Sequence, residues 1–182
     1  MGSIPAETRP AEASSSIVLD QDVERIYEQT RGSLLRFVRS LGLAPPDAEE
    51  IAQEVFLALF RHLRAGKPRD NLRGWIFRVG HNLALKQRSR GLRLSIRGEF
   101  AETPLDPAPD PEEQAADNQH RHRLLAAIDA LPERDRNCLS LRAEGLRYRE
   151  IAEVLGISLG AVAQSIERSL ARLSRIRKGG IA

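Results

Sequence analysis

Apolar residues in the first half of the chain recur with the period of an amphipathic helix. Three segments show this spacing, and none of them alternates between apolar and polar at every second residue. Gly42 and Pro45 interrupt the pattern once, and Gly66 and Pro68 interrupt it again. Since glycine and proline end helices, the pattern predicts an all-α first domain of three helices at residues 17–97.

The second predicted helix, from Asp47 to about Arg64, has one apolar stripe and one unusual residue on its other side. The residues expected to be buried share one face: Ala48, Ile51, Ala52, Val55, Leu59 and Leu63. Leu57 lies on the opposite face among charged residues, and Phe60 lies beside them. We call Leu57 and Phe60 the docking patch, because exposed apolar residues ringed by charge are typical of protein interfaces. The alternative that they complete the domain core stays open.

The third predicted helix, from about residue 71 to residue 90, combines a core face with a polar flank. The expected core residues are Leu72, Ile76, Val79 and Leu83, and the residues expected to point outward are Arg78, His81, Asn82, Leu85 and Arg88. We call Trp75, Arg78, Asn82 and Lys86 the melting flank. Their spacings of three and four residues place a stacking plane, an amide and two cations on one side, as single-stranded nucleic acid requires. A core role for the tryptophan is the alternative.

A change of charge divides the chain after this helix. Five basic residues and no acidic one lie between residues 86 and 97, whereas residues 99–117 hold seven carboxylates and no basic residue. Four prolines in the acidic stretch disfavour helix. We therefore predict an acidic, proline-rich linker at 98–118 that joins two small helical domains, the second a four-helix domain at 119–182.

The second domain carries the pattern of a helix-turn-helix over residues 147–173. Gly156 supplies the tight turn after a short helix, and Ser158 is placed to cap the next helix. The expected buried residues of the first helix are Ile151, Ala152, Val154 and Leu155, and those of the second are Val162, Ile166, Leu170 and Leu173. The opposite face presents Gln164, suited to an adenine edge, and Arg168, suited to a phosphate. We expect this motif to dock on duplex DNA; a solvated helical hairpin is the alternative.

Composition and cysteine content narrow the function further. The net charge of +3 indicates an acidic partner only weakly. Cys138 is the only cysteine, so an intrachain disulfide is excluded and we expect a small buried core residue. The four histidines form no recognisable ligand cluster, and no glycine-rich nucleotide loop is present. The sequence therefore predicts a protein that is not an enzyme and has no metal and no cofactor.

The start of the chain and its hydropathy predict the location. Residues 1–16 lack the charged segment and apolar segment that form a signal peptide, so we expect a disordered tail. No apolar run approaches the length of a membrane span. We expect a cytoplasmic protein with no membrane insertion.

Three segments resemble the extracytoplasmic-function (ECF) group of bacterial sigma factors, the promoter-recognition subunits of RNA polymerase. DAEEIAQEVFLALF at 47–60 resembles the polymerase-binding helix of that family, and LRGWIFRVGHNLALKQRSR at 72–90 resembles its promoter-melting helix. LPERDRNCLSLRAEGLRYREIAEVLGISLGAV at 131–162 resembles its second domain. The resemblance implies that residues 17–97 are sigma region 2 and residues 119–182 are sigma region 4.

The resemblance also implies a role for individual residues. The residues expected to bind core polymerase, at its β′ clamp helices, are Asp47, Glu50, Gln53, Glu54, Leu57 and Phe60. The residues expected to recognise and melt the −10 element are Arg64, Lys67, Arg69, Asp70, Asn71, Trp75, Arg78, Asn82, Lys86, Arg88 and Arg90. The residues expected at the −35 element are Arg147, Tyr148, Ser158, Gly160, Ala161, Gln164, Ser165, Arg168 and Arg172.

The implied partners are core RNA polymerase, including its β flap, promoter DNA in duplex and melted form, and an anti-sigma factor. A base flipped from the −10 element would lie in the loop from Arg64 to Asn71, and the acidic linker would thread into the polymerase. Unstacking that base costs a few kcal/mol, which the loop and the cations would offset.

One departure from the family concerns the start of the recognition helix. Ala161, Ala163 and Ser165 stand where the family usually has threonine, lysine and arginine. Because several phosphate contacts are then missing, we expect −35 recognition to be weakened or altered. Two other functions stay open: a stand-alone helix-turn-helix regulator that binds an operator as a dimer, and a sigma-like protein that only sequesters a partner.

Overall fold

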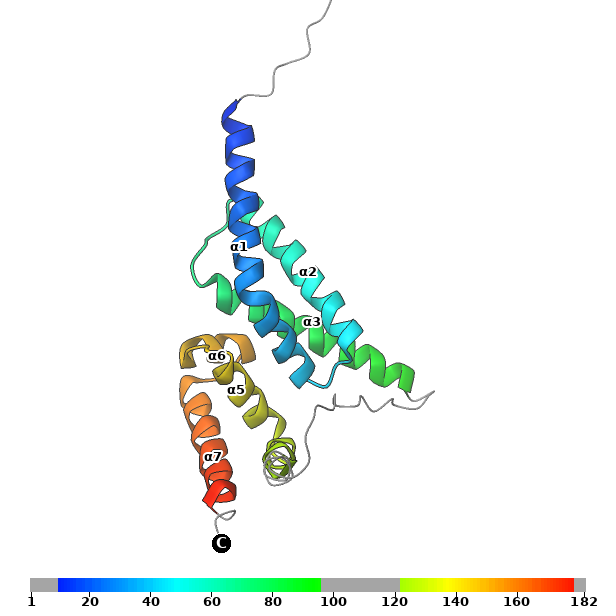
Figure 1. The fold of residues 1–182 in the computed structure, drawn as a ribbon, viewed down its shortest axis with the longest axis vertical. Helices are drawn as coiled ribbons and strands as arrows, with labels where there is room; N and C mark the ends of the chain where they lie inside the picture. Colours follow the sequence, from blue (N-terminus) through cyan, green and yellow to red (C-terminus); the bar gives the residue numbers. More distant parts are fainter. Residues whose placement is uncertain (1–9, 96–121, 179–182) are drawn as a thin grey trace, which may run out of the picture.

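The protein is built from helices in two groups (Figure 1). The computed structural model describes residues 10–95 and 122–178, with side chains described from 21 to 90 and from 122 to 175. The first group contains α1 (Pro10–Ser40), α2 (Pro45–Arg64) and α3 (Leu72–Ser95), and the second contains α5 (Glu133–Ala143), α6 (Tyr148–Leu155) and α7 (Leu159–Lys178). Residues 122–129 are also helical. The described ranges contain no strand, and the predicted all-α fold is confirmed.

The first domain packs α1, α2 and α3 against one another. Gly42 and Gly66 end the first two helices with φ of 86° and 65°, a backbone conformation that glycine adopts without steric cost. All six residues of the predicted α2 stripe are buried, and Phe56 is buried beside them. Pro45 and Pro46 lie in the first turn of α2, where a missing N–H costs no helical hydrogen bond.

The N-terminal prediction was wrong in part, because α1 begins at Pro10, inside the segment expected to be a disordered tail. Proline is favoured in the first turn of a helix, and Ala11, Glu12 and Ala13 are strong helix formers. These local preferences continue the helix toward the N-terminus.

The buried face of α3 is rotated relative to the prediction. Ile76 is buried as expected, but Leu72, Val79 and Leu83 are only half-buried. Within residues 72–90, where side chains are described, the remaining buried positions are Gly74, Phe77, Gly80, His81 and Ala84. His81 was therefore wrongly expected to point outward: only 8% of it is exposed, and its ring centroid lies 6.2 Å from that of Phe37 on α1.

Packing on two sides explains this rotation. α3 contacts both α1 and α2 within its own domain and α6 of the second domain. Gly80 faces α1 so closely that a Cβ there would lie 2.7 Å from Leu34 Cδ1. A helix covered on two sides has a wider buried face than a single stripe of leucines predicts.

The second domain contains the predicted helix-turn-helix. Gly156 ends α6 with φ of 65°, and the Ser158 hydroxyl accepts a hydrogen bond from Ala161 N at 3.2 Å, so the predicted turn and cap are confirmed. Cys138 is fully buried, also as predicted. Leu170 was expected in the core, but 54% of it is exposed.

Small polar residues take the place expected for Leu170. Ser165 and Ser169 are fully buried on α7 together with Val162 and Ile166. The Ser169 hydroxyl donates a 2.7 Å hydrogen bond to the Ser165 carbonyl, which satisfies it inside the domain. The buried face of α7 is therefore partly polar, and it packs against α5.

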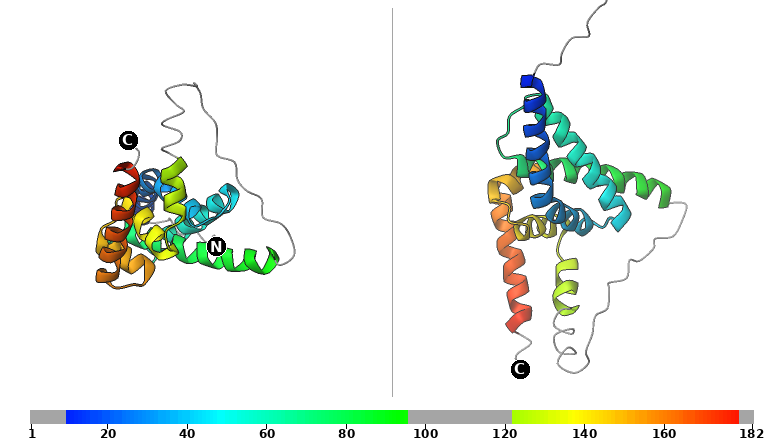
Figure 2. Two further views of the ribbon diagram at one scale, coloured as in Figure 1. Left: turned by 90° about the horizontal axis from the view of Figure 1, so that it is seen from below. Right: turned by 45° about the horizontal axis from the view of Figure 1, so that its top comes forward.

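The two domains are in contact. α3 packs against α6, and α1 meets α5. The three helices of the first domain lie together above α5 to α7, and in Figure 2 α7 extends away from the first domain. The predicted linker at 98–118 lies outside the described residues. Among the described helices, none combines the length and the apolar character needed to cross a membrane.

Candidate functional site

The outer face of α2 carries the residues predicted to bind a protein partner. Leu57 is 49% exposed, so it does not complete the domain core, and Phe60 is half-buried beside it. Glu50, Gln53 and Glu54 are exposed on the same helix, and Asp47 is half-buried near its start. The docking patch, Leu57 and Phe60, is thus surrounded by polar side chains, a composition typical of a small protein interface.

The loop between α2 and α3, residues 65–71, is held by several side-chain contacts. His62 Nε2 donates to the Pro68 carbonyl at 2.9 Å, and the His62 ring centroid lies 4.8 Å from that of Trp75. Arg69 Nη1 lies 2.6 Å from Asp22 Oδ2 of α1. The predicted −10 residues of this segment are all exposed: Arg64, Lys67, Arg69, Asp70 and Asn71.

Asn71 ends this loop in the left-handed conformation, with φ of 51°. Its side-chain oxygen accepts a 3.1 Å hydrogen bond from Gly74 N, which satisfies one of the free amides at the start of α3. The short side chain of asparagine makes it one of the few residues that tolerate this conformation. The loop therefore enters α3 with a fixed backbone shape.

The melting flank lies along α3 after this loop. Arg78, Asn82 and Lys86 are exposed, and Trp75 is half-buried where its ring meets His62. Arg90 is exposed as well. The structure thus leaves two cations and an amide of the flank open to a ligand, with the tryptophan at one end.

Arg88 differs from the exposed cations of the melting flank. Its guanidinium pairs with the carboxylate of Glu133 at the start of α5. The hydrogen bond and charge of Arg88 hold the pKa of Glu133 below its ordinary value. Arg88, which was predicted to contact the melted strand, is therefore paired with a residue of the second domain.

The helix-turn-helix exposes part of its predicted DNA surface. The exposed members are Arg147, Tyr148, Ser158, Gly160, Gln164, Arg168 and Arg172, and Ala161 is half-buried. Arg147 N donates to Glu150 Oε2 at 2.6 Å, a contact that caps the start of α6.

Two residues of this set serve the domain itself. Ser165 is fully buried, so the expectation that it faces DNA was wrong; its position on α7 turns toward α5. The Arg168 guanidinium donates to both oxygens of Asp135, at 3.0 and 3.3 Å. Burial alone would raise the pKa of Asp135, but hydrogen bonds from Arg168 and Ser165 outweigh it and leave that pKa below its ordinary value. The carboxylate is therefore charged inside the domain, with Arg168 as its counter-ion.

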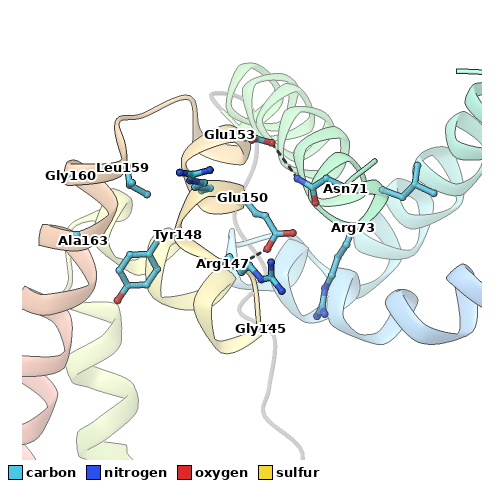
Figure 3. A pocket seen from close by; sticks show the side chains of 12 residues that line it. Asn71, Arg73, Gly145, Arg147, Tyr148, Glu150, Glu153, Leu159, Gly160 and Ala163 are labelled. Carbon is cyan, nitrogen blue, oxygen red and sulfur yellow. Dashed lines mark hydrogen bonds between the residues drawn. The ribbon is translucent and has the colours of Figure 1, made fainter. Parts of the chain in front are cut away.

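An open groove of about 1170 Å³ lies where the start of α3 meets α6 and the start of α7 (Figure 3). Asn71 Nδ2 reaches across it to Glu153 Oε2 at 3.3 Å. The side chains that line it come from both domains: Asn71, Leu72, Arg73, Arg147, Tyr148, Arg149, Glu150, Glu153, Leu159 and Ala163. The predicted −10 loop and the predicted −35 surface thus face each other.

Acidic residues that the sequence analysis did not single out hold this arrangement. Glu144 accepts two hydrogen bonds from Arg36 at 2.7 and 2.9 Å, and its carbonyl accepts another from Arg73. Asp22, Glu133 and Glu153 make the other contacts named above. Their partners lie 45 to 108 residues away in the chain, so no local spacing indicates these contacts.

Family models match both domains. Sigma-70 region 2 matches residues 26–93, and sigma-70 region 4 matches residues 121–173. The chain is 37% identical over 157 residues to the ECF sigma factor ShbA of Streptomyces griseus, covering 76% of this chain and 78% of ShbA. It is 30% identical over 153 residues to the sigma factor CnrH of Cupriavidus metallidurans, covering 79% and 80%. The match to SigE of Mycolicibacterium smegmatis, also 30% identical, spans 59% of that longer relative.

Solved structures of sigma factors share the fold. The sigma factor RpoE of Bartonella quintana, solved with the anti-sigma factor NepR, superimposes with a TM-score of 0.64 at 22% identity, covering 87% of this chain and 98% of that one. CnrH, solved with the cytosolic domain of CnrY, gives a TM-score of 0.59 at 23% identity, covering 88% and 90%. With both sigma regions matched in order and close relatives in sequence, the chain belongs to the ECF sigma factors of the sigma-70 family.

Proposed function

We propose that this protein binds core RNA polymerase as a sigma factor, directs it to promoters and opens the DNA at the start site. The observation that carries the proposal is that one chain holds a docking patch, a melting flank and a helix-turn-helix in the order of the family. The proposed action takes place in the cytoplasm and needs no catalytic group of this chain.

In the first domain, the docking patch on α2 binds the β′ clamp helices. Leu57 supplies an exposed apolar side chain to be buried there, and the carboxylates around it add charge complementarity. The neighbouring helix α3 then meets the melted strand. Trp75 stacks on a base, while Arg78 and Lys86 offset the charge of the backbone.

In the second domain, the helix-turn-helix positions the polymerase on the upstream element. Gln164 is exposed on α7 and suits an adenine edge, and Arg147 and Arg172 suit phosphates. Since Arg168 is paired with Asp135, one cation of the recognition helix is not free to contact a phosphate, which favours weaker binding by this domain alone.

The contact between the domains supports dependence on polymerase. Asn71, the last residue of the loop 65–71, lines the groove with the start of α6 and α7, and it is bonded to Glu153. These surfaces have to separate before each meets its own promoter element. We propose that binding to polymerase separates them, and that an anti-sigma factor, the class of partner bound by the neighbour RpoE, competes with polymerase for this chain.

A gel-shift assay on promoter DNA with and without core polymerase tests this function. The proposal predicts little binding by the pure chain and a specific complex once core enzyme is added. Tight binding by the pure chain as a dimer would instead identify a stand-alone regulator. Binding to core without any promoter-specific complex would identify a protein that only sequesters its partner.

A further inference from the structure

A side chain from α1 holds the loop that we assign to −10 recognition. Asp22 Oδ2 lies 2.6 Å from Arg69 Nη1, across 47 residues of sequence. Asp22 lies upstream of residue 26, where the match to sigma-70 region 2 begins. Neither the family model nor the proposed function therefore assigns it a role.

A second arginine, Arg25, orients the carboxylate of Asp22 that contacts the loop. Its other oxygen, Oδ1, accepts a 2.9 Å hydrogen bond from Arg25 Nη2, one turn further along α1. The side chain of Asp22 is 20% exposed, against 56% for Arg69, so the pair is sheltered on the α1 side. A carboxylate fixed by one arginine binds the second with less loss of side-chain entropy.

The Asp22 contact completes the support of the loop. His62 donates to the Pro68 carbonyl at the middle of the loop, and Asn71, which caps α3, holds the end of the loop. Arg69 lies between these two points. An anchor at Arg69 fixes the part of the loop that neither of the other contacts reaches.

We propose that Asp22 is a positioning residue for −10 recognition: by holding Arg69 it keeps loop 65–71 in the shape that receives the flipped base. This inference rests on the proposed function. It also changes the role of Arg69, whose guanidinium supports the loop instead of binding a phosphate. In the competing account, the ion pair with Asp22 only keeps Arg69 from contacting the DNA. The two accounts predict different effects of Asp22→Ala on promoter binding.

The test uses holoenzyme made with the full-length chain and a promoter selected from a random library by the wild-type holoenzyme. Abasic sites are introduced one at a time on the non-template strand of its −10 region, and the site with the largest loss of affinity becomes the reporter. The variants are Asp22→Ala, Arg69→Ala and the charge swap Asp22→Arg with Arg69→Asp. Glu24→Ala is the matched control, since Glu24 is an exposed acid on the same helix.

The abasic penalty is the loss of promoter affinity that the reporter abasic site causes. The proposal predicts that Asp22→Ala and Arg69→Ala each reduce this penalty about threefold, the range of one partly exposed ion pair. The charge swap restores it, and Glu24→Ala leaves it unchanged. An unchanged penalty in Asp22→Ala, or tighter promoter binding at an unchanged penalty, would overturn the proposal. The second result would support the competing account.

Hydrogen exchange on the free chain separates this inference from the proposed function. The amides of Lys67 and Gly74 are hydrogen-bonded in and beside the loop, and we expect both to exchange about threefold faster in Asp22→Ala than in Glu24→Ala. Equal exchange in the two variants would overturn the inference even if the holoenzyme is active. If exchange is faster in Asp22→Ala but the wild-type chain supports no transcription, the proposed function is refuted, whereas the anchoring of the loop by Asp22 is supported.

Discussion

The cationic side chains of the two domains have different surroundings. On α3, Arg78 and Lys86 project from the melting flank with exposed side chains, available to a ligand. On α7, Arg168 occupies the predicted DNA face, but its Nε and Nη2 both donate hydrogen bonds to Asp135. Among the described residues, the first domain buries no carboxylate, whereas the second buries Asp135 together with Ser165 and Ser169 and needs a counter-ion for it. The position of a cation on a helix face therefore does not by itself identify it as a DNA contact.

The largest effect is expected at the docking patch. Leu57→Arg replaces an exposed apolar side chain with a cation, and we expect co-purification with core polymerase to fall at least about 30-fold, the loss of one interface hot spot. Circular dichroism should show an unchanged fold, because Leu57 is not in the core. Leu85→Arg is the matched control, an exposed leucine on α3. Equal binding by both variants would remove Leu57 from the interface.

The next effect concerns the melting flank. Trp75→Ala combined with Lys86→Ala removes a stacking surface and a cation, so we expect strand opening to fall by about tenfold or more while polymerase binding stays the same. Permanganate footprinting of the start region measures the opening. Arg39→Ala removes an exposed cation from α1 and should leave the bubble intact. A normal bubble in the double variant would contradict the flank that we assign.

Arg168 and Gln164 test the comparison of the two domains directly. Arg168→Ala leaves the buried Asp135 carboxylate without its main partner, so we expect the free energy of unfolding to fall. Gln164→Ala should leave that free energy unchanged and weaken −35 binding by the holoenzyme. Chemical denaturation and promoter titration measure the two quantities. The reverse pattern would show that Arg168 acts mainly on DNA.

The smallest effect is a pH dependence from His81. Burial lowers the pKa of His81, and its Nδ1 is buried without a hydrogen-bond partner among the described residues. Because the unfolded chain binds the proton more readily, stability falls as pH drops below the ordinary value of about 6.5. We expect a loss of up to about 1 kcal/mol between pH 7 and pH 5.5 in urea denaturation. His81→Phe should lose less over that interval; an equal loss would assign the effect to another group.

Local signals predicted much of the fold. The α2 stripe, the Gly156 turn and the Ser158 cap each depend on neighbours a few residues away, and the structure shows all three. Helical periodicity also placed Leu57 on the face opposite the stripe but left a core role open, and the structure shows Leu57 exposed. Periodicity assigns a face correctly when a helix has a single buried side.

Long-range contacts account for the errors. His81 is buried because α3 is covered from two sides, and Leu170 is exposed because buried serines fill the α7 face beside α5. Asp22 and Glu144 contact arginines far away in the chain, and nothing in their local sequence indicates it. The exposure of most candidate site residues could therefore be predicted from sequence, but the contacts that hold the loop and join the two surfaces could not.

Transcription by purified core polymerase on a random promoter library tests the central claim most directly. With the chain added, we predict a new set of start sites that share upstream and −10 sequences, and none of these starts with core alone or with the Leu57→Arg variant. Start sites that do not depend on the added chain would contradict its function as a sigma factor.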